Sequence, residues 1–263
     1  MTLLAVAGAS LAVAVAAMTA TALVARRLGR VSVVDVTWGL ALVGVAVVCA
    51  LLGDGWEPWL VAVLVAVWGG RLSWHILRRS RGHREDPRYA AILGVSPEED
   101  RSAWFGAAVR KVFLVQGAAI WLVSLPLQAA AVADDFALGL VVAGVVVWVL
   151  GFVFESVGDA QLAAYKADPE RGPVMDRGLW AWTRHPNYFG DACIWWGIWL
   201  AGAVATGWLP ALATVVAPAT MTYFLAFATG ARLLERTMMK RPGYPEYAAR
   251  TSMFLPRPPR RRR

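Results

Sequence analysis

The stretch that decides the fold runs from Phe136 to Val157 and reads Phe-Ala-Leu-Gly-Leu-Val-Val-Ala-Gly-Val-Val-Val-Trp-Val-Leu-Gly-Phe-Val-Phe-Glu-Ser-Val. It contains no charged residue before Glu155. A helix needs roughly 20 mostly apolar residues to cross the hydrocarbon core of a bilayer, so this stretch predicts a membrane-spanning helix. The whole chain has the same character, because 58% of its 263 residues are hydrophobic and 14 of them are Trp. A soluble domain of this length does not need so much apolar surface to build one core.

Six further stretches have a similar composition. The sequence therefore predicts an all-α integral membrane protein, a bundle of about seven transmembrane helices, with spans near residues 3–25, 31–53, 56–77, 105–127, 136–157, 188–206 and 208–230. The first span lacks the basic residues that precede the apolar part of a secretory signal, and its positive cluster follows it at Arg26, Arg27 and Arg30. We therefore expect the first span to be retained as a transmembrane helix.

The basic residues predict the orientation of the spans. With seven spans, all 26 Lys and Arg residues fall on one side of the membrane, in residues 26–30, 71–111, 159–187 and 231–263. The opposite loops carry only the acids Asp54, Glu57, Asp134 and Asp135. Because basic loops stay on the cytoplasmic side, the N-terminus is expected outside and the C-terminus in the cytoplasm, in a multi-pass protein of the inner (plasma) membrane.

The charge and the cysteines exclude several classes of function. The net charge of +8 sits beside apolar spans, and no soluble domain is present to carry a nucleic-acid-binding groove. Anionic lipid headgroups near the basic tail and a phosphorylated cofactor are the expected partners. Residues 1–255 are expected to form one membrane domain, followed by a disordered basic tail at 256–263. Cys49 and Cys193 fall inside predicted spans, so neither a disulfide nor a metal site is predicted.

Polar residues at the cytoplasmic ends of the second and third spans form the first candidate site. Asp35 lies just inside the second span, followed by Trp38, and an ionisable residue in that position is a functional candidate. A protonated Asp35 can donate a hydrogen bond to a substrate carbonyl, whereas the alternative is a plain N-cap of the second helix. Arg71 and His75 are four residues apart, and they either hold a phosphate or anchor the third span among lipid headgroups.

A second candidate site lies at the ends of the fifth and sixth spans. Glu155 and Asp159 share one helix face because they are four residues apart, and they suit ligand hydroxyl or amide groups unless water simply solvates them. The stretch Gly178-Leu-Trp-Ala-Trp-Thr-Arg-His-Pro-Asn-Tyr-Phe-Gly-Asp191 then enters the sixth span. Pro186 breaks any preceding helix and fits the first turn of the next one. Arg184, His185 and Asn187 cluster at that helix N-terminus, which favours an anion. Asp191 lies on the same face, four residues after Asn187.

These stretches resemble the bacterial branch of the steroid 5α-reductase C-terminal family, also filed as a family of unknown function (DUF1295). The likeness covers nearly the whole chain and is carried by Ser32–Gly39, Arg71–Tyr89, Glu155–Gln161, Gly178–Asp191 and Arg241–Pro256. The Arg-His-Pro-Asn-Tyr-Phe-Gly stretch is its most specific part. One departure is Asp191, where that family usually has Glu, and the shorter side chain puts the reach of this carboxylate in question.

The resemblance implies an integral-membrane reductase in which NADPH enters from the cytoplasm and reduces a carbon–carbon double bond conjugated with a carbonyl. It implies cofactor contacts by Glu155, Asp159, His185, Asn187, Tyr188 and Tyr247, with Arg71, Lys166 and Arg184 near the phosphates. It further implies that Asp35, Trp38, His75 and Asp191 serve catalysis on a lipidic substrate, with Asp35 polarising the carbonyl. No Gly-x-Gly-x-x-Gly turn is present in the sequence, so a Rossmann domain is not the expected nucleotide site.

Two other functions remain open at this stage. Membrane isoprenylcysteine carboxyl methyltransferases resemble the same Arg-His-Pro stretch, which makes an S-adenosylmethionine-dependent methyltransferase the main alternative. Those enzymes usually carry adjacent glutamates after the last span, whereas Glu235 is flanked by Leu234 and Arg236. A transporter or lipid-binding scaffold is the non-enzymatic alternative, although the polar residues gather at the helix ends rather than at the bilayer midplane.

Overall fold

The computed structural model describes residues 2–82, 84–228 and 230–258, and every regular element in these ranges is a helix. This confirms the predicted all-α class. The chain divides into two compact units, residues 1–137 with 202–214 and residues 138–201 with 215–263. The prediction of one domain over residues 1–255 stays a prediction, and residues 259–263 of the predicted basic tail lie outside the described ranges.

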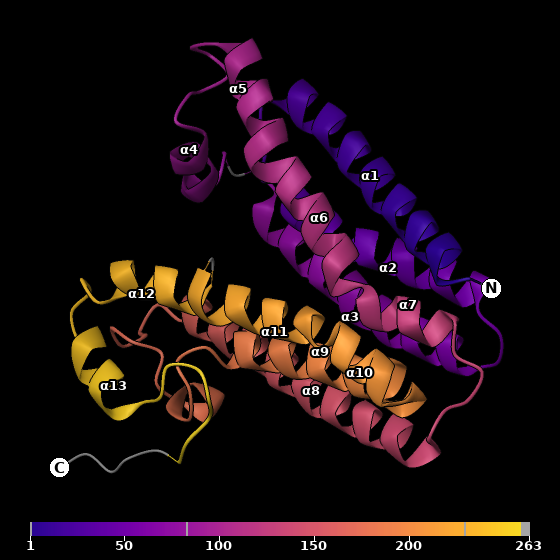
Figure 1. Cartoon of the computed structure of the whole chain (residues 1–263). Coiled ribbons are helices and arrows are strands. Elements are labelled where there is room, and N and C mark those ends of the chain that lie inside the picture. Colours follow the sequence, from indigo (N-terminus) through magenta and orange to yellow (C-terminus); the bar gives the residue numbers. More distant parts are fainter. Residues whose placement is uncertain (1, 83, 229, 259–263) are drawn as a thin grey trace. The chain divides into compact units, whose positions relative to one another are not determined.

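The first unit contains the N-terminal helices (Figure 1). They are α1 (Leu3–Leu28), α2 (Val34–Leu52), α3 (Glu57–Ser80), α4 (Pro87–Leu93), α5 (Arg101–Ala108), α6 (Leu114–Val123), α7 (Leu125–Ala131) and α10 (Trp208–Thr214). A π-helical turn over Val109–Phe113 joins α5 to α6, and a 3-10 turn over Val204–Thr206 precedes α10. Helix α2 contacts both α1 and α3, and α7 contacts all three. The core of this unit therefore lies around α2.

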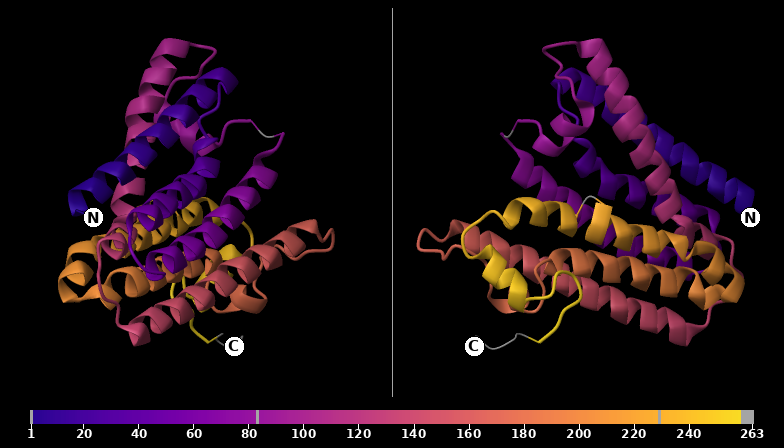
Figure 2. Two further views of the ribbon diagram at one scale, coloured as in Figure 1. Left: turned by 90° about the vertical axis from the view of Figure 1, so that its right-hand side faces the viewer. Right: turned by 60° about the vertical axis from the view of Figure 1, so that its left-hand side comes forward.

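The second unit is built on two helices that lie side by side, α8 (Leu138–Ala167) and α9 (Pro186–Gly202) (Figure 2). A 3-10 turn over Gly178–Ala181 leads into α9. The remaining elements are α11 (Val216–Tyr223), a π-helical turn at Phe224–Ala228, α12 (Ala231–Met238) and α13 (Tyr244–Arg250). The indole Nε1 of Trp196 on α9 donates to Thr222 Oγ1 on α11 at 3.0 Å, which ties these two helices together.

Six helical segments among the described residues are long and apolar enough to cross a membrane: Leu3–Leu28, Val34–Leu52, Glu57–Ser80, Arg101–Val123, Leu138–Ala167 and Trp208–Met238. They indicate a multi-pass membrane protein. Helix α9, which corresponds to the predicted sixth span, has 17 residues and lies at the lower limit of a spanning length. It begins at Pro186, which confirms the predicted helix start.

Several predicted boundaries are wrong, among them the end of the sixth span, expected near residue 206, because α9 ends at Gly202. The fourth span was expected over 105–127, but its helix runs from Arg101 to Val123 and ends before Ser124, because Pro126 has no N–H to continue the ladder. The fifth span was expected to end near Val157, but α8 continues to Ala167. Residues 159–167 are mostly good helix formers, and the helix stops only where Pro169 disfavours helical geometry at Asp168. Asp159 therefore lies on the helix, as its predicted shared face with Glu155 requires, and Lys166 is a helical residue, not a loop residue.

Candidate functional site

The first cluster of candidate residues is positioned by a close crossing of α2 and α3. A Cβ placed on Gly39 would lie 2.5 Å from the carbonyl oxygen of Gly69, and a Cβ on Gly69 would lie 2.7 Å from that of Gly39. Two backbones can approach so closely only where neither residue has a side chain. The hydroxyl of Ser73 on α3 adds a hydrogen bond to the carbonyl of Val36 on α2 at 2.8 Å. The crossing therefore fixes the start of α2, where Asp35 lies.

Asp35 receives its hydrogen bonds from α4. Tyr89 Oη donates to Asp35 Oδ1 at 2.5 Å, and Arg88 Nη2 lies 3.4 Å from Oδ2. Asp86 caps α4 by accepting from the backbone N–H of Arg88 at 2.8 Å, and Pro87 occupies the first helical turn. The alternative that Asp35 is a plain N-cap is wrong, because Val33 holds the N-cap position and Asp35 lies within the first turn.

Glu85 holds the loop before α4 against the start of α2. Its carboxylate accepts hydrogen bonds from the backbone N–H groups of Val31 at 2.5 Å and Ser32 at 2.9 Å. It also accepts from the N–H of Asp86 at 3.0 Å. These bonds bring a loop more than 50 residues away in the sequence to the residues that precede α2. The position of Tyr89 over Asp35 follows from this attachment.

The environment keeps the Tyr89 hydroxyl protonated. Tyr89 is buried, with 7% of its surface exposed. Burial, followed by the nearby charge of Asp35, raises the pKa of Tyr89 well above its ordinary value. Burial acts in the same upward direction on Asp86, but the hydrogen bonds from Arg88 outweigh it and lower the pKa of Asp86. Tyr89 is thus a buried hydrogen-bond donor at neutral pH beside an acidic pair.

The other predicted site residues of the first unit lie on α2 and α3. Trp38 is half-buried on α2, and Arg71 and His75 are half-buried on one face of α3. The structure places none of these three among the hydrogen-bond partners of Asp35, which come from α4. In the sequence, Tyr89 was noted only as the end of a resembling stretch. The Asp86-Pro87 pair, an N-cap followed by a first-turn proline, was the local signal that Tyr89 lies on an ordered helix.

Glycines spaced seven residues apart pack α8 against α9. Gly144, Gly151 and Gly158 lie on α8, and Gly190 and Gly197 lie on α9. A Cβ on Gly151 would lie 2.5 Å from the carbonyl oxygen of Gly190, and a Cβ on Gly197 would lie 2.6 Å from that of Gly144. A heptad spacing keeps these positions on one helix face, so the two backbones meet along the whole contact.

This packing leads to a prediction for Gly190→Ala. The added Cβ would lie 2.5 Å from both the backbone N of Glu155 and the carbonyl oxygen of Gly151, so the helices must separate. We expect a loss of about 1–3 kcal/mol in the free energy of unfolding, measured from the unfolding midpoint in detergent. The control is Gly139→Ala on α8, where no atom lies within 4 Å of the new Cβ. An unchanged midpoint for Gly190→Ala would contradict the close helix contact.

The same packing places the predicted acidic residues on facing helices. Glu155 is buried on α8 and Asp191 is buried on α9, with 3% and 8% of their surfaces exposed. Asn187 Nδ2 donates to Asp159 Oδ1 at 3.2 Å, so the predicted pair of cofactor residues is joined directly. The buried Oδ1 of Asn187 has no hydrogen-bond partner among the described residues. Lys166 is exposed near the end of α8, about 10 Å along the helix axis from Asp159.

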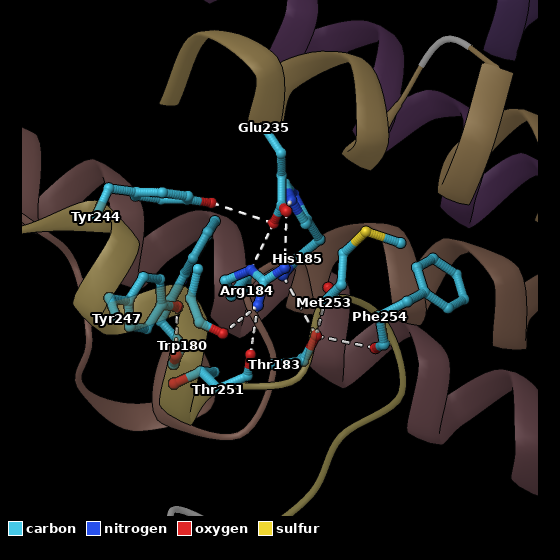
Figure 3. A network of polar contacts seen from close by, with 11 residues as sticks. Trp180, Thr183, Arg184, His185, Glu235, Tyr244, Tyr247, Thr251, Met253 and Phe254 are labelled. Atoms are coloured by element: carbon cyan, nitrogen blue, oxygen red, sulfur yellow. Dashed lines mark hydrogen bonds and ion pairs between the residues drawn. The ribbon is translucent and has the colours of Figure 1, made fainter. Parts of the chain in front are cut away.

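Arg184 is the centre of a network of polar contacts (Figure 3). Its Nε and Nη2 donate to the two carboxylate oxygens of Glu235 at 2.5 and 2.7 Å. Its Nη1 donates to the carbonyl oxygens of Ala248 and Thr251 at 2.8 and 2.5 Å. Burial alone would lower the pKa of Arg184, but Glu235 outweighs that effect and raises it. All three nitrogens of the guanidinium are therefore engaged by the protein itself.

Aromatic residues surround this ion pair. His185 Nε2 lies 3.3 Å from Glu235 Oε1, and the His185 ring stacks on Tyr188 with centroids 5.5 Å apart. Tyr244 Oη also donates to Glu235 Oε1 at 3.3 Å (Figure 3). Burial, followed by the charge of Glu235, raises the pKa of Tyr244. Three side chains thus converge on Glu235, which sequence reasoning noted only as a solitary acid.

Tyr247 and the segment after α13 complete the network. Tyr247 Oη donates to the carbonyl of Trp180 at 2.5 Å, and Trp180 Nε1 donates to the carbonyl of Gly158 on α8 at 3.0 Å. The backbone N–H of Arg184 donates to the carbonyl of Ser252 at 2.8 Å. The Thr183 hydroxyl is within 2.9 Å of the Phe254 carbonyl (Figure 3). The Arg-His-Pro stretch is therefore held by the C-terminal segment.

The comparisons with known proteins give one family. The sequence profile of the family described as "Protein of unknown function (DUF1295)" matches residues 21–251. The chain belongs to this family. No match was found among curated proteins or among solved structures. The matched range of the DUF1295 family contains every candidate site residue, including the Tyr89–Asp35 pair and the Arg184–Glu235 network.

Proposed function

We propose that this protein is a membrane-embedded, NADPH-dependent reductase of a carbon–carbon double bond conjugated with a carbonyl in a lipidic, steroid-like or acyl substrate. The proposal rests on the resemblance of the Arg-His-Pro-Asn-Tyr-Phe-Gly and Asp35–Gly39 stretches to the steroid 5α-reductase C-terminal family. We also propose that the chain crosses the inner membrane seven times, with α9 as the sixth span. In this topology the N-terminus lies outside and the site faces the cytoplasm. Reporter fusions test that orientation, and a cytoplasmic signal from a fusion after Asp135 would contradict it.

The observation that carries the reductase proposal is the hydrogen bond between Tyr89 and Asp35. Reduction of such a double bond places negative charge on the carbonyl oxygen, and a fixed donor stabilises that charge. The Tyr89 hydroxyl is buried and protonated, and a substrate carbonyl competes with Asp35 for its hydrogen. In this proposal Tyr89 takes the donor role that the sequence suggested for Asp35, and Asp35 orients the hydroxyl.

The cofactor residues of the second unit fit part of NADPH. When bound, the cofactor supplies the hydride that adds to the carbon remote from the carbonyl. Asp159 and the buried Asn187 Oδ1 offer acceptors for hydroxyl or amide donors, such as those of a ribose or a carboxamide. Arg184 fits a phosphate less well, because Glu235 already takes its bidentate face. Lys166, exposed on α8, is the basic residue of this unit that we assign to the phosphates.

The engagement of Arg184 favours a second candidate function, S-adenosylmethionine-dependent methyl transfer. S-adenosylmethionine carries no phosphate, so a site that uses it does not need a guanidinium for that purpose. The Arg-His-Pro stretch bound to Glu235 would then form the wall of a methyl-donor site. Methyl transfer gives no role to the Tyr89–Asp35 pair or to a substrate carbonyl. We therefore rank the methyltransferase function second.

Ligand binding separates the two candidates. We expect NADPH, and not S-adenosylmethionine, to stabilise the detergent-purified protein. At a hundredfold excess over Kd the free energy of unfolding should increase by about 2.7 kcal/mol, which is seen as a higher melting temperature. Asp159→Ala should reduce that effect, whereas Asp168→Ala, in the exposed turn after α8, should not. NADPH oxidation with an enone lipid would then establish the reaction. Stabilisation by S-adenosylmethionine alone would overturn the reductase proposal.

A further inference from the structure

A cavity of about 1020 Å³ lies in the first unit, beside the C-terminal end of α1. Its wall combines Leu28 and Arg30 with Arg84 from the loop before α4 and with the segment between α4 and α5. It is separate from the Tyr89–Asp35 pair, because neither residue lines it. Neither candidate function assigns it a role.

The cavity lies where three candidate spans end. Helix α1 ends at Leu28, α3 ends at Ser80, and the span that includes α5 begins at Arg101. Arg30 Nη1 donates to the Ser80 carbonyl at 3.4 Å, and Arg101 Nη2 donates to the Arg26 carbonyl at 2.6 Å. These contacts hold the three ends at one level. In a membrane this level corresponds to the polar headgroup region, which begins where the apolar spans stop.

The cavity carries charges of both signs. Arg30 and Arg84 line it together with Glu85, Glu98 and Glu99. The carboxylate of Glu85 is engaged by three backbone N–H groups, and that of Glu99 accepts from the N–H of Ser96 at 2.8 Å. Glu98 therefore remains as the acid that we assign to a cationic group, and the two guanidinium groups suit a phosphate.

Much of the rest of the wall is apolar. Leu93 and Trp104 are buried, whereas Leu28 is 62% exposed at the end of α1. The volume exceeds that of a phosphate with a short amine, so it has room for a glycerol and the first carbons of acyl chains along Leu28. This combination of apolar residues with a few charged groups is the composition expected of a site for an amphipathic molecule.

We propose that this cavity binds the headgroup of a phospholipid that carries both a phosphate and a primary ammonium, as in phosphatidylethanolamine. Arg30 and Arg84 receive the phosphate, and Glu98 accepts hydrogen bonds from the ammonium. A quaternary ammonium has no N–H to donate, and a glycerol headgroup has no positive charge. The cavity therefore selects among phospholipids by the nitrogen as well as by the phosphate.

The test is binding of short-chain lipids to the full-length protein in detergent, measured by native mass spectrometry or thermal shift. The probes are dihexanoyl phosphatidylethanolamine, phosphatidylglycerol and phosphatidylcholine, with soluble phosphoethanolamine as the headgroup alone. We expect phosphatidylethanolamine to bind about fivefold tighter than the other two lipids, the size of one exposed ion pair. Glu98→Gln should remove that preference and leave phosphatidylglycerol binding unchanged. Arg84→Gln should weaken all three lipids.

The controls are Glu170→Gln and Arg177→Gln, two exposed charges in the second unit, which should change nothing. Equal binding of the three lipids, or a preference for phosphatidylethanolamine that survives Glu98→Gln, would overturn the proposal. Tighter binding of phosphatidylglycerol would show a simple anion site and overturn it as well. Binding of soluble phosphoethanolamine without the lipid would reassign the cavity to a soluble ligand. Because NADPH binding is not measured, these outcomes are independent of the proposed function.

Discussion

Tyr89→Phe is expected to lower the turnover of enone reduction by a factor of about 10²–10³, the usual cost of removing one donor to a developing oxyanion. The ring keeps its packing, so NADPH binding and the unfolding midpoint should change little. Single-turnover oxidation of NADPH with an enone lipid measures the effect. Because burial and the charge of Asp35 raise the pKa of Tyr89, wild-type activity should not fall as pH rises through about 10, the ordinary tyrosine value.

Two comparisons make this result specific. Tyr165→Phe removes the hydroxyl of a tyrosine on α8 that donates to the Gly172 carbonyl, and it should leave turnover unchanged. Asp35→Asn keeps the size of the side chain that accepts from Tyr89 and should lower turnover while sparing cofactor affinity. Full activity of Tyr89→Phe would remove Tyr89 from the chemistry, and the reductase proposal would lose the observation that carries it.

Glu235→Ala is expected to destabilise the second unit by about 3 kcal/mol or more, because it leaves Arg184 without its bidentate partner in a mostly buried site. The side chains of Arg184 and Glu235 are only 10% and 13% exposed. Glu235 also accepts from His185 and Tyr244, so the substitution breaks four contacts. The unfolding midpoint in detergent, together with protease sensitivity of the segment after α13, measures the effect.

A double-variant comparison separates the ion pair from simple loss of side-chain volume. Arg184→Leu combined with Glu235→Ala removes both charges, and its destabilisation should be smaller than the sum of the two single effects. Glu246→Ala, an exposed acid on α13, is the matched control and should shift the midpoint by less than about 0.5 kcal/mol. Strict additivity of the two single substitutions would show that Arg184 and Glu235 do not act as a pair.

Local sequence signals predicted the helices better than their ends. The apolar run of α8 was visible because nothing charged interrupts it before Glu155, but its extension to Ala167 was missed because charges within a helix resemble a loop in hydropathy. Pro186 marked the start of α9 because proline fits only the first turn. The break at Ser124 was missed, since no charged residue lies between Lys111 and Pro126 to mark the end of the span.

The candidate site was also predicted only in part from the sequence. Asp159 and Asn187 were chosen from separate stretches, and their hydrogen bond places both at one location. Tyr89 was considered only as the end of a resembling stretch and Glu235 only as an acid without an adjacent glutamate, because no local pattern shows which distant residues they meet. Their partners, Asp35 and Arg184, lie 54 and 51 residues away in the chain.

The sequence by itself determined that this chain is a helical membrane protein with its polar residues near the ends of its spans, since apolar length and the distribution of Lys and Arg are local properties of the chain. Only the tertiary structure decided which of those residues meet. Glycine contacts such as Gly39–Gly69 and Gly151–Gly190 set the helix separations, and the Glu85 attachment brings Tyr89 to Asp35. A hydrogen bond forms only within about 3 Å, so a pairing between distant residues depends on packing that no local pattern specifies.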